Sequence, residues 1–235
     1  TLNQLLVRLS SAFAAERSFT ANAAHELRTP LAGALAQLQR LRQTSTDPES
    51  ARRAEEVEAT LKRLTRLSER LMQLARAEGA RVLTDAPQDL RPILRIIAGD
   101  FSQGPDAGRV TMSLPDAPTP SDIDPDAVAI IARNLIENAL RHGQGPVAVV
   151  LDKKGELTVE NDCPPISPAD LAALSGRFVR GTNAGEGSGL GLAIVHTIAE
   201  RIGSPLCLAS PLPGKFNGFS ASILLRVPPY QDPSR

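Results

Sequence analysis

The first third of the chain repeats apolar residues at steps of three and four, and this spacing constrains the fold more than any other feature of the sequence. Such steps place the residues on one face of an α-helix, with charged residues on the other faces. The first stripe comprises Leu27, Leu31, Leu35, Leu38 and Leu41. The second comprises Val57, Leu61, Leu64, Leu67, Leu71 and Leu74. Two long helices are therefore predicted.

Residues 44–49 separate the two stripes and read Thr-Ser-Thr-Asp-Pro-Glu. They offer a capping residue and a proline for the first helical turn, which mark the start of a new helix. A short loop makes the two helices antiparallel neighbours, and one hairpin alone cannot bury both stripes. A homodimeric four-helix bundle is the natural completion. The stripes by themselves fit a plain coiled coil or a solenoid segment equally well.

Composition narrows the class of protein. The chain has 26 basic and 26 acidic residues, so its formal net charge is zero and nothing favours nucleic-acid binding by bulk electrostatics. Cys163 and Cys207 lack the spacing of metal ligands, which fits a reducing compartment. No apolar run approaches the roughly 20 residues that cross a bilayer. Because the sequence starts within a helical pattern and shows no signal peptide, we expect a cytoplasmic fragment of a longer protein.

The pattern changes after the helical hairpin, which we assign to residues 1–79. Residues 80–88 are expected to be a linker, and a mixed α/β domain follows at residues 89–229, with a tail at 230–235. Helices are predicted at residues 90–101, 125–142 and 191–202, the second capped by Asp124 and closed by Gly143. Strands are predicted at residues 109–114, 147–151, 156–159, 206–209 and 219–227, with a hairpin turn at 153–155.

A histidine, an acid and a hydroxyl occur together on the first helix. His25 and Thr29 are four residues apart and share a helix face, with Glu26 alongside. Pro30 removes a backbone donor and should bend the helix below that face. An exposed nucleophile beside a polarising acid suits chemistry on a partner that docks from outside.

Two asparagines mark the predicted helix at residues 125–142. Asn134 and Asn138 are four apart, so both amides leave the helix on one side. Amide oxygens are good ligands of Mg²⁺, and Arg141 adds a planar, positively charged group for phosphate. Taken alone, the motif is better explained as two solvated polar residues on an amphipathic helix.

A glycine-rich loop, Gly-Glu-Gly-Ser-Gly-Leu-Gly at residues 185–191, runs directly into a predicted helix. Backbone amides at such a helix terminus hold phosphates, and glycine lets the chain approach them closely. A Rossmann site is excluded because no strand of a βαβ unit leads directly into the loop. A P-loop is excluded because no lysine follows the last glycine.

Together and in this order, the three motifs resemble those of sensor histidine kinases of two-component systems. The segment around His25 is similar to their phospho-acceptor box. The asparagine motif and the glycine loop resemble the asparagine box and distal glycine box of an ATP-binding domain shared with gyrase-type topoisomerases and mismatch-repair ATPases. Residues 177–181, Arg-Phe-Val-Arg-Gly, look like the phenylalanine box of the lid over the nucleotide. The resemblance covers the whole chain and implies a dimeric helical hairpin followed by an α/β sandwich that binds ATP.

The resemblance also implies the chemistry. His25 would accept the γ-phosphoryl group of ATP with Glu26 as general base, and would pass it to an aspartate of a response regulator. Thr29 matches the position that orients a water for dephosphorylating that regulator, although a threonine before proline can equally bond a backbone carbonyl. A preceding sensor region would anchor the full-length protein in the inner membrane.

The implied nucleotide site uses ATP and Mg²⁺, with the metal on Asn138. His142 would approach the nucleotide, although a histidine in a last helical turn is equally explained by the helix dipole. The residues expected to line the site are Asn134, Asn138, Arg141, His142, Asn161, Gly187, Gly189, Leu190 and Gly191.

One motif departs from the family pattern. Where the family carries Asp-x-Gly-x-Gly, residues 159–166 read Val-Glu-Asn-Asp-Cys-Pro-Pro-Ile. This alignment puts Asn161 in the place of the Asp that accepts from the adenine amino group, and Cys163 and Pro165 in the glycine places. A neutral amide oxygen still accepts, but more weakly than a carboxylate. Asp162 is the other candidate, although strand alternation points it the opposite way.

Two alternatives follow. The altered loop allows a degenerate kinase that binds nucleotide weakly and acts mainly as a phosphatase or scaffold for a response regulator. A gyrase-type ATPase without histidine phosphorylation is the other possibility, and the His25 motif argues against it.

Overall fold

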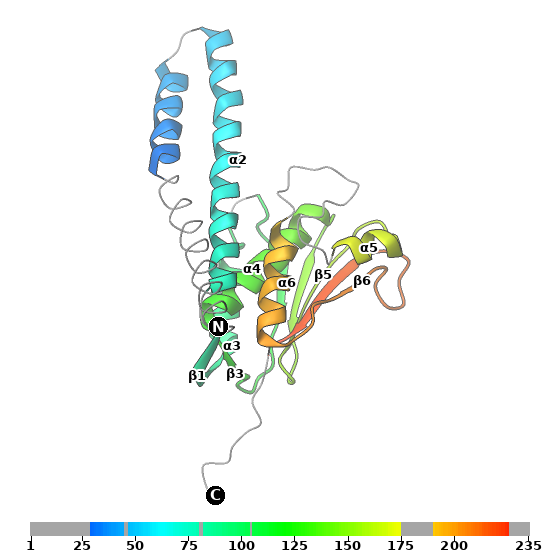
Figure 1. The fold of residues 1–235 in the computed structure, drawn as a ribbon. Helices are drawn as coiled ribbons and strands as arrows, with labels where there is room; N and C mark the ends of the chain where they lie inside the picture. The colour runs from blue at the N-terminus through cyan, green and yellow to red at the C-terminus, as the bar shows by residue number, and fades with distance from the viewer. Residues whose placement is uncertain (1–28, 45–46, 80–81, 104, 175–189, 226–235) are drawn as a thin grey trace, which may run out of the picture. The chain divides into compact units, whose positions relative to one another are not determined.

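The computed structural model describes residues 29–44, 47–79, 82–103, 105–174 and 190–225. The chain divides into two compact units, residues 1–79 and residues 80–235 (Figure 1). The first unit is helical and the second combines helices with two sheets, which confirms the predicted fold class of a helical region followed by an α/β domain.

The helical unit is a hairpin. Residues 29–44 form one helix, and α2 (Pro48–Gly79) runs antiparallel beside it (Figure 1). The predicted break between the two stripes is therefore confirmed. Leu41, Val57, Leu64 and Leu67 of these stripes are 38–50% exposed, so neither described helix covers this part of the apolar surface.

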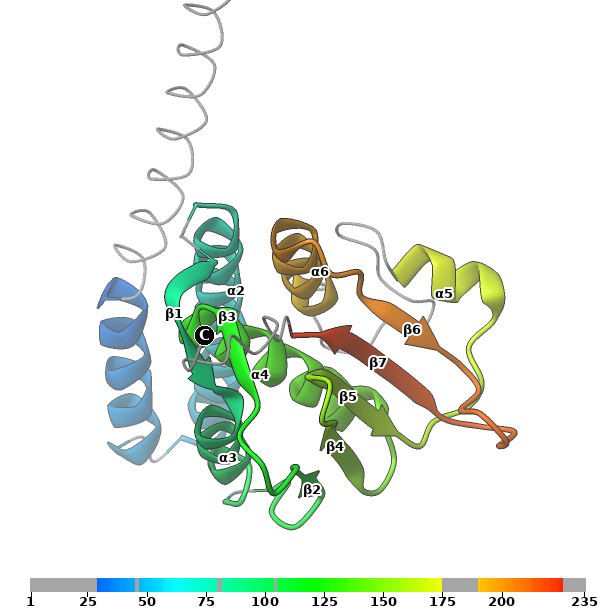
Figure 2. The same ribbon diagram turned by 90° about the horizontal axis from the view of Figure 1, so that it is seen from below.

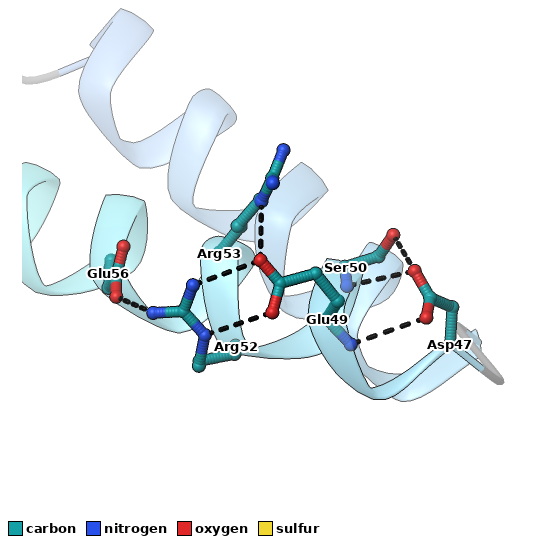
Figure 3. Close-up of polar contacts among 6 residues, drawn as sticks. All are labelled: Asp47, Glu49, Ser50, Arg52, Arg53 and Glu56. Carbon is teal, nitrogen blue, oxygen red and sulfur yellow. Dashed lines mark hydrogen bonds and ion pairs between the residues drawn. The ribbon is translucent and has the colours of Figure 1, made fainter.

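The start of α2 is fixed by Asp47 (Figure 3). Its carboxylate accepts from the backbone N–H of Glu49 at 3.3 Å and of Ser50 at 3.0 Å, and from Ser50 Oγ at 2.5 Å. These bonds, those of Ser50 first, lower the pKa of Asp47. Capping satisfies backbone donors that have no partner within the helix, so α2 begins here.

Charged residues line the first turns of α2 (Figure 3). Glu49 Oε1 lies 3.0 Å from Arg52 Nη2 and 3.0 Å from Arg53 Nε, and Arg52 also pairs with Glu56. Exposed pairs three and four residues apart each stabilise a helix by a few tenths of a kcal/mol, roughly 0.2–0.5. They support the helix but do not determine how it packs.

A buried carboxylate joins the two helices. The Glu58 side chain is 5% exposed, and its oxygens lie 3.3 Å from Arg42 Nη1 on the opposite helix and 2.6 Å from Lys62 Nζ on its own. The hydrogen bond from Lys62 is the largest cause of a lowered pKa at Glu58, and Arg42 contributes. Since a buried charge needs its partners, this ion pair favours one register of the hairpin.

The α/β unit follows α2 in the order β1 (Leu83–Asp89), α3 (Leu90–Asp100), β2 (Val110–Ser113), β3 (Pro120–Ile123), α4 (Pro125–His142), β4 (Val147–Leu151), β5 (Glu156–Asn161), α5 (Pro168–Leu174), α6 (Leu190–Ile202), β6 (Cys207–Ala209) and β7 (Phe219–Leu224). Five of these strands form one sheet in the order β2-β4-β5-β7-β6. The β2–β4 pair is parallel and the other pairs are antiparallel.

Helices α4 and α6 lie side by side on one face of the five-stranded sheet (Figure 2). Alternate residues of the strands point to this face, so Val147, Val149 and Leu151 of β4 are buried. Ile131 of α4 and Ile194 of α6 are also fully buried. Each such aliphatic side chain stabilises the fold by roughly 1.5–3 kcal/mol.

Residues 80–88, expected to be a linker, instead carry strand β1, which pairs with β3 in a two-stranded antiparallel sheet. These strands could not be predicted from the sequence, because Pro87, Pro120 and several acidic residues interrupt the alternation of polar and apolar residues that is typical of a strand. Helix α5 was also missed, and β5 extends two residues beyond its predicted end. That extension brings Asn161 into the sheet.

Candidate functional site

Helix α4 carries most of the candidate site, and its ends are determined locally. The Asp124 side chain accepts from the backbone N–H of Asp126 at 2.9 Å and of Ala127 at 3.3 Å, and Pro125 follows the cap. At the other end, Gly143 N donates to Ala139 O at 2.8 Å. Both predicted ends of this helix are confirmed.

The two asparagines of α4 have different surroundings. Asn134 is 3% exposed, and its Nδ2 donates to Ile130 O at 2.8 Å. Asn138, one turn later, is half-buried, and no hydrogen bond joins its side chain to another residue of the described part of the chain. Of the two amides, that of Asn138 is the one accessible to a ligand.

Arg141 and His142 end α4, and both are exposed. Partial desolvation, and secondarily the positive charge of Arg141, lower the pKa of the His142 imidazole. The lowered pKa favours the neutral imidazole, and Arg141 provides the positive charge at this end of the helix.

Asn161 is the last residue of β5 and lies within the sheet, opposite Val147 of β4 and Phe219 of β7. The residue is 4% exposed. Among the described residues its buried Oδ1 has no hydrogen-bond partner, while its Nδ2 makes a long bond, 3.4 Å to Asp162 O, and the side chain also interacts with the Cys163 thiol. A buried acceptor without a partner costs about 1–3 kcal/mol. Such an atom indicates a ligand that brings a donor.

The end of β5 and the end of α4 meet at Asn161. A Cβ added to Gly143 would lie 2.8 Å from both Cβ and Nδ2 of Asn161, and Gln144 N donates to Asp162 O at 2.8 Å. Only a glycine allows this close approach. Asp162 itself is exposed, and its Oδ1 accepts from Asn217 Nδ2 at 2.5 Å. The buried acceptor at this place is therefore Asn161.

Cys163 lies next to this pair. Burial raises the pKa of its thiol, and the Asn161 side chain is within hydrogen-bonding reach of the sulfur. Cys163 O accepts from Gly218 N at 2.7 Å, and Ile166 N donates to Ser210 Oγ at 3.0 Å. These two hydrogen bonds to backbone atoms of residues 163 and 166 hold the loop, which carries Cys163 and Pro165 at the places where glycines were expected.

The remaining predicted residues are only partly described. Leu190, 2% exposed, and Gly191 begin α6, which packs against α4. His25, Glu26, Gly187, Gly189 and residues 177–181 lie outside the described residues. Thr29 is exposed on the helix of residues 29–44 and belongs to the other unit.

The arrangement suits a ligand with both an amino group and an anionic part. Asn161 offers a buried acceptor, Asn138 an amide oxygen, and Arg141 a positive charge. Helix α6, which begins at Leu190, packs against the helix that carries Asn138 and Arg141. Within the described residues no cluster of three or more His, Cys, Asp and Glu could hold a metal ion. No described helix is both long enough and apolar enough to cross a membrane.

Gly143 was predicted only as the end of a helix, and its contact with Asn161 was missed. The sequence does carry a signal for it, because a glycine at the end of a helix that bears the asparagine motif permits close approach to another chain segment. The partner segment depends on the sheet register, which local spacing does not give.

Comparisons with known proteins identify the family. Residues 123–229 match the family described as "Histidine kinase-, DNA gyrase B-, and HSP90-like ATPase", and residues 15–80 match "His Kinase A (phospho-acceptor) domain". The sensor protein QseC of Salmonella typhi is 32% identical over 92% of this chain, and the sensor protein kinase PmrB of Pseudomonas aeruginosa is 33% identical over 95%.

The chain belongs to the sensor histidine kinase family. It spans about half the length of these relatives, 49% of QseC and 48% of PmrB. Two solved histidine kinases share the fold. ShkA, crystallised full-length with AMPPNP, is 23% identical with a TM-score of 0.65, covering 91% of this chain and 47% of ShkA. AdeS of Acinetobacter baumannii is 22% identical with a TM-score of 0.53, covering 86% of this chain and 98% of AdeS.

Proposed function

We propose that this chain is an ATP-dependent protein-histidine kinase that phosphorylates its own His25 and passes the phosphoryl group to an aspartate of a response regulator. One observation carries the proposal beyond family membership. The buried, unpartnered Oδ1 of Asn161 lies beside the end of the helix that bears Asn138 and Arg141. It matches the need of an adenine base for an acceptor opposite its amino group.

Each residue of the site has a proposed role in holding ATP. Asn161 accepts from the adenine amino group, and His142 lies against the nucleotide as a neutral ring. Arg141 pairs with phosphate, and the amide oxygen of Asn138 is a ligand for Mg²⁺, which would neutralise charge on the phosphates. Asn134, buried one turn earlier, supports this face of α4.

The phosphate end of the nucleotide is assigned to the start of α6 and the loop before it. Backbone N–H groups of Gly187, Gly189, Leu190 and Gly191 would donate to phosphate oxygens, and the helix dipole favours negative charge there.

The first transfer step uses His25 as the nucleophile. Glu26 accepts a hydrogen bond from one imidazole nitrogen, so that the other keeps a free lone pair. A bond forms between that nitrogen and the γ-phosphorus, the bond from the phosphorus to the bridging β–γ oxygen breaks, and ADP departs. In the second step a carboxylate oxygen of the regulator's aspartate attacks the phosphorus, and the nitrogen–phosphorus bond breaks.

We further propose a homodimer in which a second copy covers the exposed apolar residues of the hairpin. The exposure of Leu41, Val57, Leu64 and Leu67 supports this, because a four-helix bundle buries such stripes. Phosphatase activity through Thr29, a cytoplasmic location of this chain and anchorage of the full-length protein through a sensor region in the inner membrane remain predictions.

A second function is a degenerate kinase that serves mainly as a phosphatase or scaffold. The amide at Asn161 favours it, since a neutral acceptor holds an amino group less strongly than a carboxylate. The two functions differ in nucleotide binding, because a scaffold has little Mg²⁺-dependent affinity for ATP.

Labelling with γ-³²P ATP and Mg²⁺ tests the proposal. The unaltered chain should gain label that is stable in base and labile in acid, and His25→Gln and Asn138→Ala should lose it. Glu156→Gln, an exposed carboxylate on β5, is the matched control and should keep it. A folded, dimeric chain that takes up no label would refute the kinase, and little Mg²⁺-dependent affinity of that chain for ATP would favour the scaffold.

A further inference from the structure

The amide of Asn161 can be read in two orientations. The structure places Nδ2 3.4 Å from Asp162 O, and no other described residue partners the buried Oδ1. A bond of 3.4 Å lies at the weak limit of hydrogen bonding. Little stabilisation therefore holds the amide in this orientation, and a half-turn about its last side-chain bond exchanges the nitrogen and the oxygen.

The exchanged orientation also has a partner. The Asn161 amide nitrogen is in hydrogen-bonding reach of Cys163 Sγ. Burial keeps this thiol protonated, so its S–H can donate to an oxygen placed on the same side. Turning the amide thus gives up the long bond to Asp162 O and keeps a bond with the thiol, in which sulfur is now the donor. The atom presented to a ligand is an acceptor in one orientation and a donor in the other.

The two purine bases require opposite groups at this place. Adenine carries an amino donor at position 6 and an acceptor at N1, whereas guanine carries a carbonyl acceptor at position 6 and a donor at N1. A carboxylate only accepts, so it pairs with the amino group of adenine and repels the carbonyl of guanine. A primary amide has one accepting and one donating end and complements either edge.

We propose that Asn161 relaxes the choice between adenine and guanine, so that this chain binds GTP about as well as ATP. The inference rests on the proposed nucleotide site and concerns the specificity of that site. A buried pair of well-placed hydrogen bonds typically discriminates between bases about 5- to 150-fold. A carboxylate at this position would provide this preference for adenine over guanine. An amide that can adopt both orientations would not.

The test is isothermal titration of the 235-residue chain with ATP and with GTP, each with Mg²⁺. The unaltered chain should bind GTP with a Kd within about tenfold of that for ATP. The variant Asn161→Asp should raise the ratio of the GTP Kd to the ATP Kd at least about tenfold. Asn161→Ala, which has neither donor nor acceptor, should weaken both nucleotides and leave their ratio near one.

The outcomes separate this inference from the proposed function. Binding of ATP with a GTP Kd more than about tenfold higher overturns the inference and leaves the kinase standing. Failure to bind either nucleotide overturns both. An unchanged ratio in Asn161→Asp shows that this residue does not choose the base. The buried carboxylate of Asn161→Asp could prevent folding, which would be seen as loss of the thermal unfolding transition. In that case Asn161→Ala is the deciding variant. Undiminished binding of both nucleotides by Asn161→Ala would refute a contact between this residue and the base.

Discussion

Asp89 connects three elements of the α/β unit, and replacing it with asparagine should lower the stability of that unit in a pH-dependent way. The carboxylate caps α3 by accepting from Arg91 N at 3.2 Å, and it accepts from Thr119 N at 3.0 Å, just before β3. Arg91 Nη2 lies 2.8 Å from Oδ2, and the Asp89 side chain is only 27% exposed. Asp89→Asn keeps the shape of the side chain and removes its charge.

The magnitude follows from the pKa. The hydrogen bond from Arg91 is the largest cause that lowers the pKa of Asp89 from 3.8 to about 2. A lowered pKa means that the folded state prefers the carboxylate, so its stabilisation is complete above the unfolded pKa and is lost as pH falls through the folded value. The shift of about 1.8 pKa units corresponds to about 2.4 kcal/mol at pH 7 and to about half of that at pH 3. Allowing for solvent screening, we expect a loss of about 1–2.5 kcal/mol at pH 7.

Hydrogen-exchange mass spectrometry in rising urea measures this loss, because peptides covering residues 83–123 report on the α/β unit separately from the hairpin. The difference between Asp89→Asn and the unaltered chain should be largest at pH 7 and should be about halved at pH 3. Glu156→Gln, an exposed carboxylate to amide change, should stay within about 0.5 kcal/mol of the unaltered chain at both pH values. A difference that does not vary with pH, or one below about 0.5 kcal/mol at pH 7, would refute the assignment of the stabilisation to this ionised cap.

Three further changes test other parts of the structure. Gly143→Ala would place a Cβ 2.5 Å from Ala139 O and 2.8 Å from Asn161 Nδ2, so it should destabilise the α/β unit by about 1–3 kcal/mol and weaken nucleotide binding. Gly99→Ala, which meets nothing within 4 Å, should do neither, as thermal unfolding with and without ATP would show. Glu58→Gln leaves Arg42 and Lys62 without their shared carboxylate, so circular dichroism should record a lower melting temperature of the helices; an unchanged value would mean that the buried pair contributes nothing net. Leu64→Glu should shift sedimentation from dimer to monomer, whereas the exposed Arg63→Glu should not, and a dimer that persists in Leu64→Glu would contradict the proposed interface.

Local sequence signals predicted the elements that local interactions determine. Helix α4 was predicted at both ends because Asp124, Pro125 and Gly143 each act within a few residues of the chain. The hairpin break was predicted for the same reason, through the cap at Asp47. Strands β1 and β3 were missed because their pairing joins residues about 35 positions apart and neither strand alternates in polarity.

In the candidate site, too, local features were predicted from the sequence and features that depend on distant segments were not. Alternation along β5 correctly indicates that Asn161 is buried and Asp162 exposed. The unpartnered state of Oδ1 could not be predicted, because it depends on where Gly143 and Cys163 lie after the sheet has formed. The roles of the predicted site residues remain predictions until binding and labelling are measured.

The departure at Asn161 is easier to understand from its surroundings than from the motif alone. A carboxylate at this buried position would lie one residue from Asp162 and beside a thiol that burial keeps neutral, so its charge would need a ligand or a cation to offset the loss of water. The amide carries no such charge, and the cost of its unpartnered oxygen is that of a single neutral acceptor. The bonds of Cys163 O and Ile166 N hold the following loop without the family's glycines. An amide therefore suits a site without ligand better than a carboxylate does, and in the proposed nucleotide site the same change would remove the charge that excludes guanine.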